Sequence, residues 1–153
     1  MTDQQTTPRG TSYLWFPDLV PHQERLVVVA EQEEELRFSY KGIYAYLGPT
    51  QIIASAVMYR LFLQAIDEMS PGKPPQRTGF DITLGFSGLG IAEASELITR
   101  LKTRNPQGIR VCPPPADCPA PKAGDGALYF EITMEGSRRM FWPLAPCFDD
   151  TFR

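Results

Sequence analysis

The sequence predicts an α+β fold, in which a small and mostly antiparallel sheet packs on two main helices, one of them long and buried. Three patterns support this prediction. Residues 49–69 are almost uniformly apolar, residues 80–104 read as a strand followed by an amphipathic helix, and residues 127–145 read as a β-hairpin. Strands and helices of this kind bury their apolar faces against each other.

The central helix is predicted to begin at Pro49 and to end before Ser70-Pro71-Gly72. Proline is favoured at a first helical position, because its missing N–H group would have no partner there. The polar side chains are scattered around the cylinder, so the helix has almost no polar face. Such a helix is buried on most sides. We therefore expect it in the core, or partly in an oligomer interface.

Two short segments precede this helix. Residues 25–30 have the β-branched density of a strand, and residues 31–35 read as a charged turn or a short helical start. Residues 36–40 alternate apolar and polar side chains. They are predicted to form a second short strand or the approach to the central helix.

Residues 80–86 alternate with period two and predict a strand with Asp81 and Thr83 facing outward. Residues 91–104 predict one amphipathic helix, whose acidic side chains lie toward its start and basic ones toward its end. The glycines of the corner between them have the spacing G-x-x-G-x-G. This is not the dinucleotide-binding fingerprint, and close packing of the strand against the helix explains it better.

The last part of the chain predicts mainly β structure. Residues 108–111 read as a short strand, and the proline-rich residues 112–121 as an extended loop. Residues 127–134 alternate cleanly, and a turn at residues 135–137 returns the chain along residues 139–145. This pattern is typical of a β-hairpin.

The length of 153 residues suits a single domain. Residues 1–12 are polar and aperiodic, so we expect a flexible tail, or an arm that lies on a partner subunit, followed by one α+β domain over residues 13–153. A small domain cannot bury all of the apolar surface of residues 13–16 and of the central helix. A homodimer is therefore expected.

Charge and cysteine content exclude some functions and favour a compartment. The 15 basic and 18 acidic residues give a net charge of -3, which argues against nucleic-acid binding. Arg60 lies within the central helix, so we expect no membrane span. Three cysteines and no basic-then-apolar leader favour the cytoplasm.

Polar aromatic residues gather before the central helix and predict a site there. Tyr40, Lys41, Tyr44 and Tyr46 precede Gly48, and a helix start presents free N–H groups that suit an anion. A small molecule or an anion is therefore the expected ligand. The alternative is that these tyrosines are half-buried packing residues.

Other candidate groups are weaker. His22 is the only histidine, and the C-x5-C spacing of Cys112 and Cys118 is not a common zinc spacing. A metal site would need Cys147 and His22 from distant parts of the chain, so none is predicted. The sequence identifies no cofactor.

The run Tyr44-Ala45-Tyr46-Leu47-Gly48-Pro49 and the apolar helix after it resemble the FmdE-like proteins, the family of the FmdE component of formylmethanofuran dehydrogenase. In that family a His-Gly-His-x-x-Pro run opens a long buried helix. The strand and helix of residues 80–104 and the late hairpin agree in outline, so the resemblance covers residues 36–142.

The resemblance implies a changed pocket. Family members with the full motif have histidines, and cysteines further on, that suit a metal. Here Tyr44 and Tyr46 occupy the two histidine positions, and Ser87 stands in the strand-to-helix corner where a cysteine is expected. The resemblance thus implies a member that kept the scaffold, lost the metal ligands, and uses Ser87 in ligand binding.

Two main functions follow. The first is a non-catalytic accessory or small-ligand-binding protein with its pocket at the start of the central helix. The alternative is an enzyme, or part of an FmdE-like enzyme complex, that uses one of the tyrosines as acid or base, while Lys41 or the helix start holds an anionic group. A third reading is an interaction protein that works through the aromatic patch of residues 13–16.

Overall fold

The computed structural model describes residues 11–14 and 25–143. Residues 1–10 of the predicted tail, Trp15 and Phe16 of the aromatic patch, His22 and Cys147 lie outside these ranges, and for residues 11–14 only the backbone is described. The chain order is β1 (Thr11–Leu14), β2 (Val27–Glu31), β3 (Glu34–Phe38), α1 (Tyr40–Leu47), η2 (Pro49–Gln51), α2 (Ile52–Met69), η3 (Arg77–Gly79), β4 (Phe80–Leu84), α3 (Leu89–Thr99), α4 (Leu101–Arg104), β5 (Ile109–Val111), β6 (Lys122–Ala123), β7 (Gly126–Ala127), β8 (Phe130–Met134) and β9 (Ser137–Pro143).

A five-stranded sheet forms the centre of the fold, in the order β1-β9-β8-β4-β5. Its inner pairs, β9 with β8 and β8 with β4, are antiparallel, and its two edge strands pair in parallel. The β4-to-β5 connection runs through α3 and α4, because parallel neighbours need a crossover. Two-stranded sheets β2-β3 and β6-β7 complete the β structure. The predicted α+β class is confirmed.

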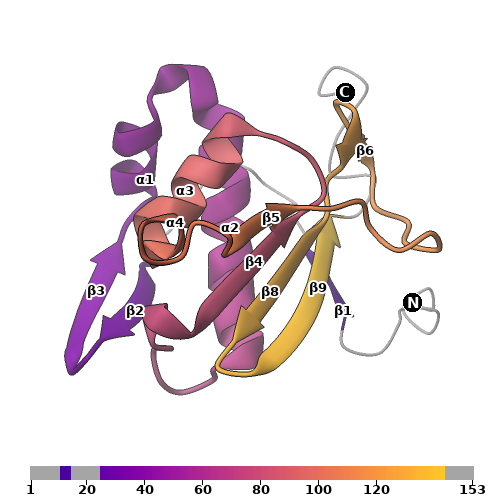
Figure 1. Cartoon of the computed structure of the whole chain (residues 1–153). Helices are drawn as coiled ribbons and strands as arrows, with labels where there is room; N and C mark the ends of the chain where they lie inside the picture. Colours follow the sequence, from indigo (N-terminus) through magenta and orange to yellow (C-terminus); the bar gives the residue numbers. More distant parts are fainter. Residues whose placement is uncertain (1–10, 15–24, 144–153) are drawn as a thin grey trace.

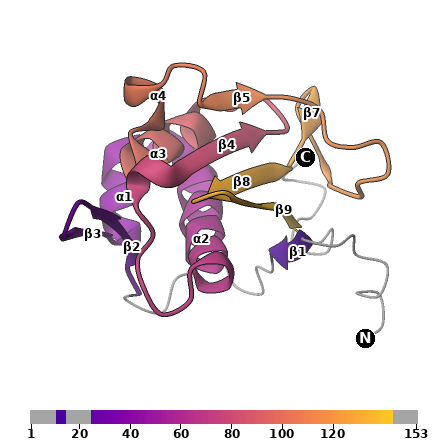
Figure 2. The ribbon, with the colours of Figure 1, turned by 60° about the horizontal axis from the view of Figure 1, so that its bottom comes forward.

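Helices α1, α2 and α3 lie together on one side of the sheet (Figures 1 and 2). The register of β4 and β8 explains which side chains they cover, since Phe80 pairs with Met134, Ile82 with Ile132, and Leu84 with Phe130. All of these pack in the same core as Phe62, Leu61 and Ile98. A smaller cluster, built around Ala127, Tyr129 and Trp142, packs against Cys118 and Ala120 of the proline-rich loop.

The central helix is confirmed as α2, and most of its middle is buried. A helix that was not predicted, α1, comes before it. Ser39 caps α1 by accepting a hydrogen bond from the Gly42 N–H group at 2.9 Å, and Ile43 and Leu47 bury its inner face. Gly48 then takes a φ of 91°, which favours glycine, and Pro49 begins the 3-10 turn that leads into α2.

The helix predicted over residues 91–104 is two helices. The chain breaks at Arg100, whose φ of 53° is left-handed. The buried Thr99 hydroxyl accepts from the Leu101 N–H group at 3.1 Å and donates to the Ser95 carbonyl at 2.7 Å. These bonds end α3 and start α4, so a single amphipathic pattern covers two elements.

Strand β4 is confirmed, and Thr83 lies with Asp81 on the face of the sheet opposite to the core residues Ile82 and Leu84, as predicted. Thr83 is nevertheless only 7% exposed. The Arg110 guanidinium of the neighbouring strand β5 lies 3.4 Å from its hydroxyl oxygen. Asp81 is partly exposed and pairs with the same arginine at 3.4 Å.

The β2-β3 hairpin stands away from the main sheet (Figure 1). It confirms the strand predicted in residues 25–30 and decides between the two readings of residues 36–40 in favour of a strand. Val27 and Val29 point into the core, whereas Leu26 is exposed and Val28 partly so. In the described ranges, no helix combines the length and apolar character needed to cross a bilayer.

Candidate functional site

The four predicted ligand-binding residues before Gly48 lie on helix α1. With about 100° between successive residues, Tyr40 and Tyr44 fall on one side of the helix and Tyr46 on the other. The Tyr40 and Tyr44 rings stack with centroids 6.4 Å apart. The Tyr40 ring also meets Tyr59 of α2 edge to face at 5.5 Å. The structure therefore brings together two of the four residues.

Tyr40 keeps its proton at neutral pH. Burial raises the pKa of its phenol, and the nearby Tyr44 raises it further. Desolvation disfavours the charged phenolate. Tyr40 is thus suited to packing and hydrogen bonding rather than to the abstraction of a proton.

The other predicted residues lie on the surface. Lys41 and Ser87 are exposed, and Tyr46 is 56% exposed. The Tyr44 carbonyl accepts from the Gly48 N–H group at 2.7 Å, which closes α1 just before the start of α2. The predicted helix start is therefore a joint between two helices rather than the end of a loop.

A small apolar hollow lies beside this joint, and we call it the helix-start pocket. Its volume is about 140 Å³. One wall comes from η2 and α2, and the other from the corner that leads into α3. Leu89 is 68% exposed and Ile53 is 43% exposed, although both line the pocket. The described lining residues are Gln51, Ile53, Ala54, Val57, Phe86, Gly88, Leu89, Gly90, Ile91 and Leu128.

Close packing of α2 and α3 builds this pocket. A Cβ atom on Gly90 would lie 2.3 Å from the Gln51 Oε1 atom and 2.8 Å from the Ala54 Cβ atom. Gly90 is therefore needed for the helices to approach. Close packing explains this glycine, but it packs α3 against α2, whereas the sequence indicates packing against the preceding strand. Gly48 precedes one wall of the pocket in the chain, and Ser87 lies in the chain between two residues of the other wall, Phe86 and Gly88, but does not line the pocket itself.

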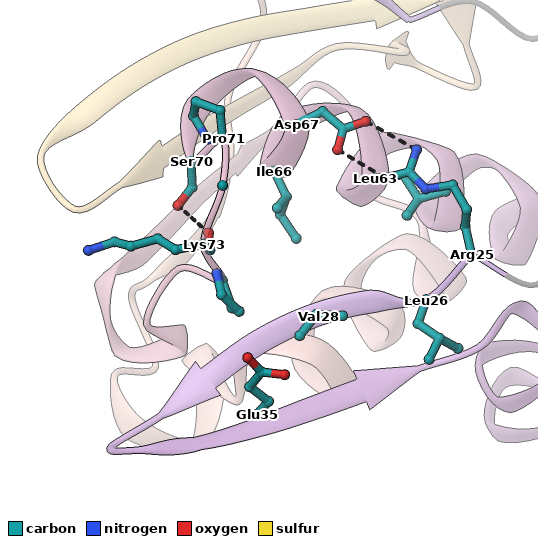
Figure 3. A pocket seen from close by; sticks show the side chains of 12 residues that line it. Arg25, Leu26, Val28, Glu35, Leu63, Ile66, Asp67, Ser70, Pro71 and Lys73 are labelled. Carbon is teal, nitrogen blue, oxygen red and sulfur yellow. Dashed lines mark hydrogen bonds and ion pairs between the residues drawn. The ribbon is translucent and has the colours of Figure 1, made fainter.

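A larger hollow, not predicted from the sequence, lies between β2 and the second half of α2 (Figure 3). We call it the hairpin hollow; its volume is about 470 Å³. Arg25 and Asp67 close one end with two hydrogen bonds of 3.1 and 2.9 Å. The Asp67 carboxylate raises the pKa of Arg25 against the opposing effect of burial. The lining residues are Arg25, Leu26, Val28, Glu35, Leu63, Ile66, Asp67, Ser70, Pro71, Gly72, Lys73 and Pro74.

A local signal for this hollow exists in the sequence. Leu26 and Val28 alternate with the buried valines of β2, and Leu63 and Ile66 are one helical turn apart. Each pair predicts an apolar strip outside the core. The sequence does not show that the two strips face each other, because this depends on how the hairpin folds back on α2.

Cys112 and Cys118 are free thiols, and burial raises the pKa of Cys118. Both thiols are near enough to the buried Tyr129 hydroxyl to influence its ionisation. Among the described residues, no group of three or more His, Cys, Asp and Glu side chains is placed to hold a metal ion.

Comparisons with known proteins give no relative. No family model, no curated protein and no solved structure matches this chain. The resemblance to the FmdE-like proteins therefore stays a prediction. The function has to be inferred from the geometry of this chain alone.

Proposed function

We propose that this protein is a non-catalytic binding protein that holds the compact apolar part of a small ligand in the helix-start pocket. The observation that carries the proposal is the exposure of Leu89 and Ile53 at the mouth of an apolar hollow. Large apolar side chains grouped around a hollow gain free energy when a ligand covers them.

The size and chemistry of the pocket define the ligand. Its volume of about 140 Å³ is close to that of an apolar cavity known to hold benzene. One aromatic ring or one branched aliphatic group therefore fits. Gln51 supplies an amide that can orient a polar substituent. The described lining residues are uncharged, so they can hold an apolar group but supply no ionised acid or base.

An NMR titration tests this proposal, with indole and isobutanol as probes. We expect shifts of the backbone amide signals of residues 51–57 and 86–91 in the full chain. Ala54→Met should fill the pocket and abolish the shifts. Leu26→Ala, a change to an exposed side chain outside the pocket, should leave them unchanged. Amides that do not respond to either probe would contradict the proposal.

We further infer a homodimer in the cytoplasm. Ile52 and Tyr46 are exposed close to the pocket in the chain, which supports an apolar contact between subunits. The free thiols of Cys112 and Cys118 fit a reducing compartment. Light scattering after size exclusion should give twice the chain mass for the wild type and for Leu26→Lys, but a monomer for Ile52→Lys. A monomeric wild type would contradict the dimer.

A further inference from the structure

The outer edge of strand β2 faces the hairpin hollow, and its backbone groups at Val28 have no hydrogen-bond partner among the described residues. The Ala30 N–H group donates to the Pro75 carbonyl at 2.8 Å, and Ala30 forms an isolated parallel bridge with Gln76. Ala30 therefore points its backbone away from β3. Because backbone directions alternate along an antiparallel pair, Val28 directs its N–H and C=O groups to the same outer side.

The chain's own segment stops pairing before it reaches Val28. If the parallel bridge at Ala30 continued, the Val28 N–H group would donate to the Lys73 carbonyl. This bond is not formed, and the Lys73 carbonyl accepts from the Ser70 hydroxyl at 2.8 Å. The Val28 carbonyl would need an N–H group from residue 75, which is a proline and has none. Within the part of the chain that the structure describes, the edge of β2 is therefore open beside Val28.

The wall opposite this edge is apolar. Leu63 and Ile66 of α2 are partly buried and line the hairpin hollow. Figure 3 shows the Ile66 side chain pointing from α2 toward β2. An extended chain bonded to Val28 would therefore place every second side chain against α2, since side chains alternate along a strand.

The charges around the hollow favour an acidic occupant. Arg25 pairs with Asp67, and Glu35 pairs with Arg37. Lys73 is exposed at the rim and has no ion pair within the part of the chain that the structure describes. Arg25, Glu35 and Asp67 are thus each neutralised by an ion-pair partner, and Lys73 is the charged lining residue whose ammonium group is left to attract a carboxylate.

We propose that the hairpin hollow binds an extended, acidic peptide segment of a partner protein, which adds a strand to β2. The segment exchanges backbone hydrogen bonds with Val28, places a branched apolar side chain against Leu63 and Ile66, and sets a carboxylate beside Lys73. Addition of a strand to a free edge is a common form of peptide recognition. The site is separate from the helix-start pocket and does not depend on its function.

Phage display of random decapeptides on the full-length protein tests this proposal. We expect the selected peptides to alternate branched apolar residues with polar ones and to contain Asp or Glu. A synthetic peptide of the selected sequence should slow hydrogen exchange of the Val28 amide at saturation. Every second backbone N–H group of the bound peptide should point toward β2. Methylation of these nitrogens should weaken binding, whereas methylation of the nitrogens between them should not.

Charge variants provide the matched control. Lys73→Glu should lower the affinity for the peptide by about tenfold, because an attractive charge contact becomes a repulsive one. Lys122→Glu, at another exposed lysine that does not line the hollow, should not weaken it. Both variants change only exposed side chains, so folding is not at risk. Equal weakening by the two variants would overturn the proposal.

Hydrogen exchange of the Val28 amide in the free protein tests whether something other than a partner peptide covers the edge of β2. Slow Val28 exchange that depends on protein concentration would assign the edge to a second copy of the chain. Slow exchange that is independent of concentration would show that another part of the same chain covers the edge. Either result, a Val28 amide that does not respond to bound peptide, or a selection that enriches no peptide would overturn the proposal.

Discussion

The Arg77 Nε atom donates a hydrogen bond to the Ile98 carbonyl oxygen, 3.1 Å away, and so ties the start of β4 to the end of α3. The same guanidinium donates to the Leu97 carbonyl at 3.3 Å and pairs with Glu31 at 3.0 Å. The last carbonyls of a helix have no partner inside the helix. Arg77, which is buried, supplies partners for two of them.

Replacement of Arg77 should therefore destabilise the fold. Arg77→Met keeps the length of the side chain but leaves the Leu97 and Ile98 carbonyls without their donor. We expect a loss of about 2–4 kcal/mol in the free energy of unfolding, measured in urea. Arg138→Met is the matched control, because the Arg138 side chain is mostly exposed and pairs with Glu131 at 2.7 Å. Its loss should stay below about 1 kcal/mol; equal losses would refute the role of Arg77.

Gly90 should tolerate no side chain. In Gly90→Ala the new Cβ atom would meet Gln51 and Ala54, and the Ala54 Cβ atom cannot rotate away. Helices α2 and α3 must then separate, at a cost of about 1–3 kcal/mol in the free energy of unfolding. Urea unfolding measures this change.

Gly42→Ala gives the comparison for Gly90. The Gly42 residue is exposed within α1, and its new Cβ atom would lie 3.2 Å from the Ser39 hydroxyl oxygen. Alanine is also the better helix former, so the stability should stay within about 1 kcal/mol of the wild type. A Gly90→Ala protein as stable as Gly42→Ala would show that the close helix approach is not needed.

The contrast between α2 and α1 shows what the sequence could predict. Helix α2 and the β8-β9 hairpin follow from patterns that recur over many residues. Helix α1 is only eight residues long, so its Ser39 cap and the helical spacing of Ile43 and Leu47 are weak signals. The amphipathic pattern continues across Arg100 and so does not indicate the break there. Besides the local Thr99 bonds, Arg77, about twenty residues earlier in the chain, binds the carbonyls at the end of α3.

The candidate site, too, could be predicted from the sequence only in part. The sequence indicates the region of Gly48 and the glycine-rich corner, and the helix-start pocket lies between these segments. It does not indicate Leu128, which comes from a distant part of the chain, or the separation of Tyr46 from Tyr44 around α1. Those depend on tertiary packing and on a helix that was not expected.

Glu96 should stabilise the start of α4 only while it is ionised. Burial opposes its ionisation, but hydrogen bonds from the Thr103 hydroxyl and from the Lys102 and Thr103 N–H groups, with Arg100 nearby, lower its pKa overall. A lowered pKa gives stability that is present above the unfolded-state pKa and is lost as the pH falls through the folded-state pKa. Glu96→Gln should therefore lower the urea midpoint at pH 7.

The pH dependence of this effect is its control. The difference between Glu96→Gln and the wild type should shrink as the pH falls below the ordinary glutamate value of 4.5. Glu93→Gln, a change to a partly exposed carboxylate of the same helix, should show a smaller difference at pH 7. A difference for Glu96→Gln that stays constant down to acid pH would contradict the role of its charge.

Tyr129 should make the fold sensitive to alkaline pH. Burial, followed by the nearby Glu131 carboxylate, raises the pKa of its phenol from 10 to about 12. Below pH 10 both the folded and the unfolded chain keep this proton. Between pH 10 and 12 only the unfolded chain loses it, so stability falls as the pH rises.

Tyr129→Phe removes this effect, and its urea midpoint should rise relative to the wild type across this range. Tyr46→Phe, at an exposed tyrosine, should follow the wild type. If the gap between Tyr129→Phe and the wild type were constant from pH 8 to 12, the buried phenol would not be the group that titrates late.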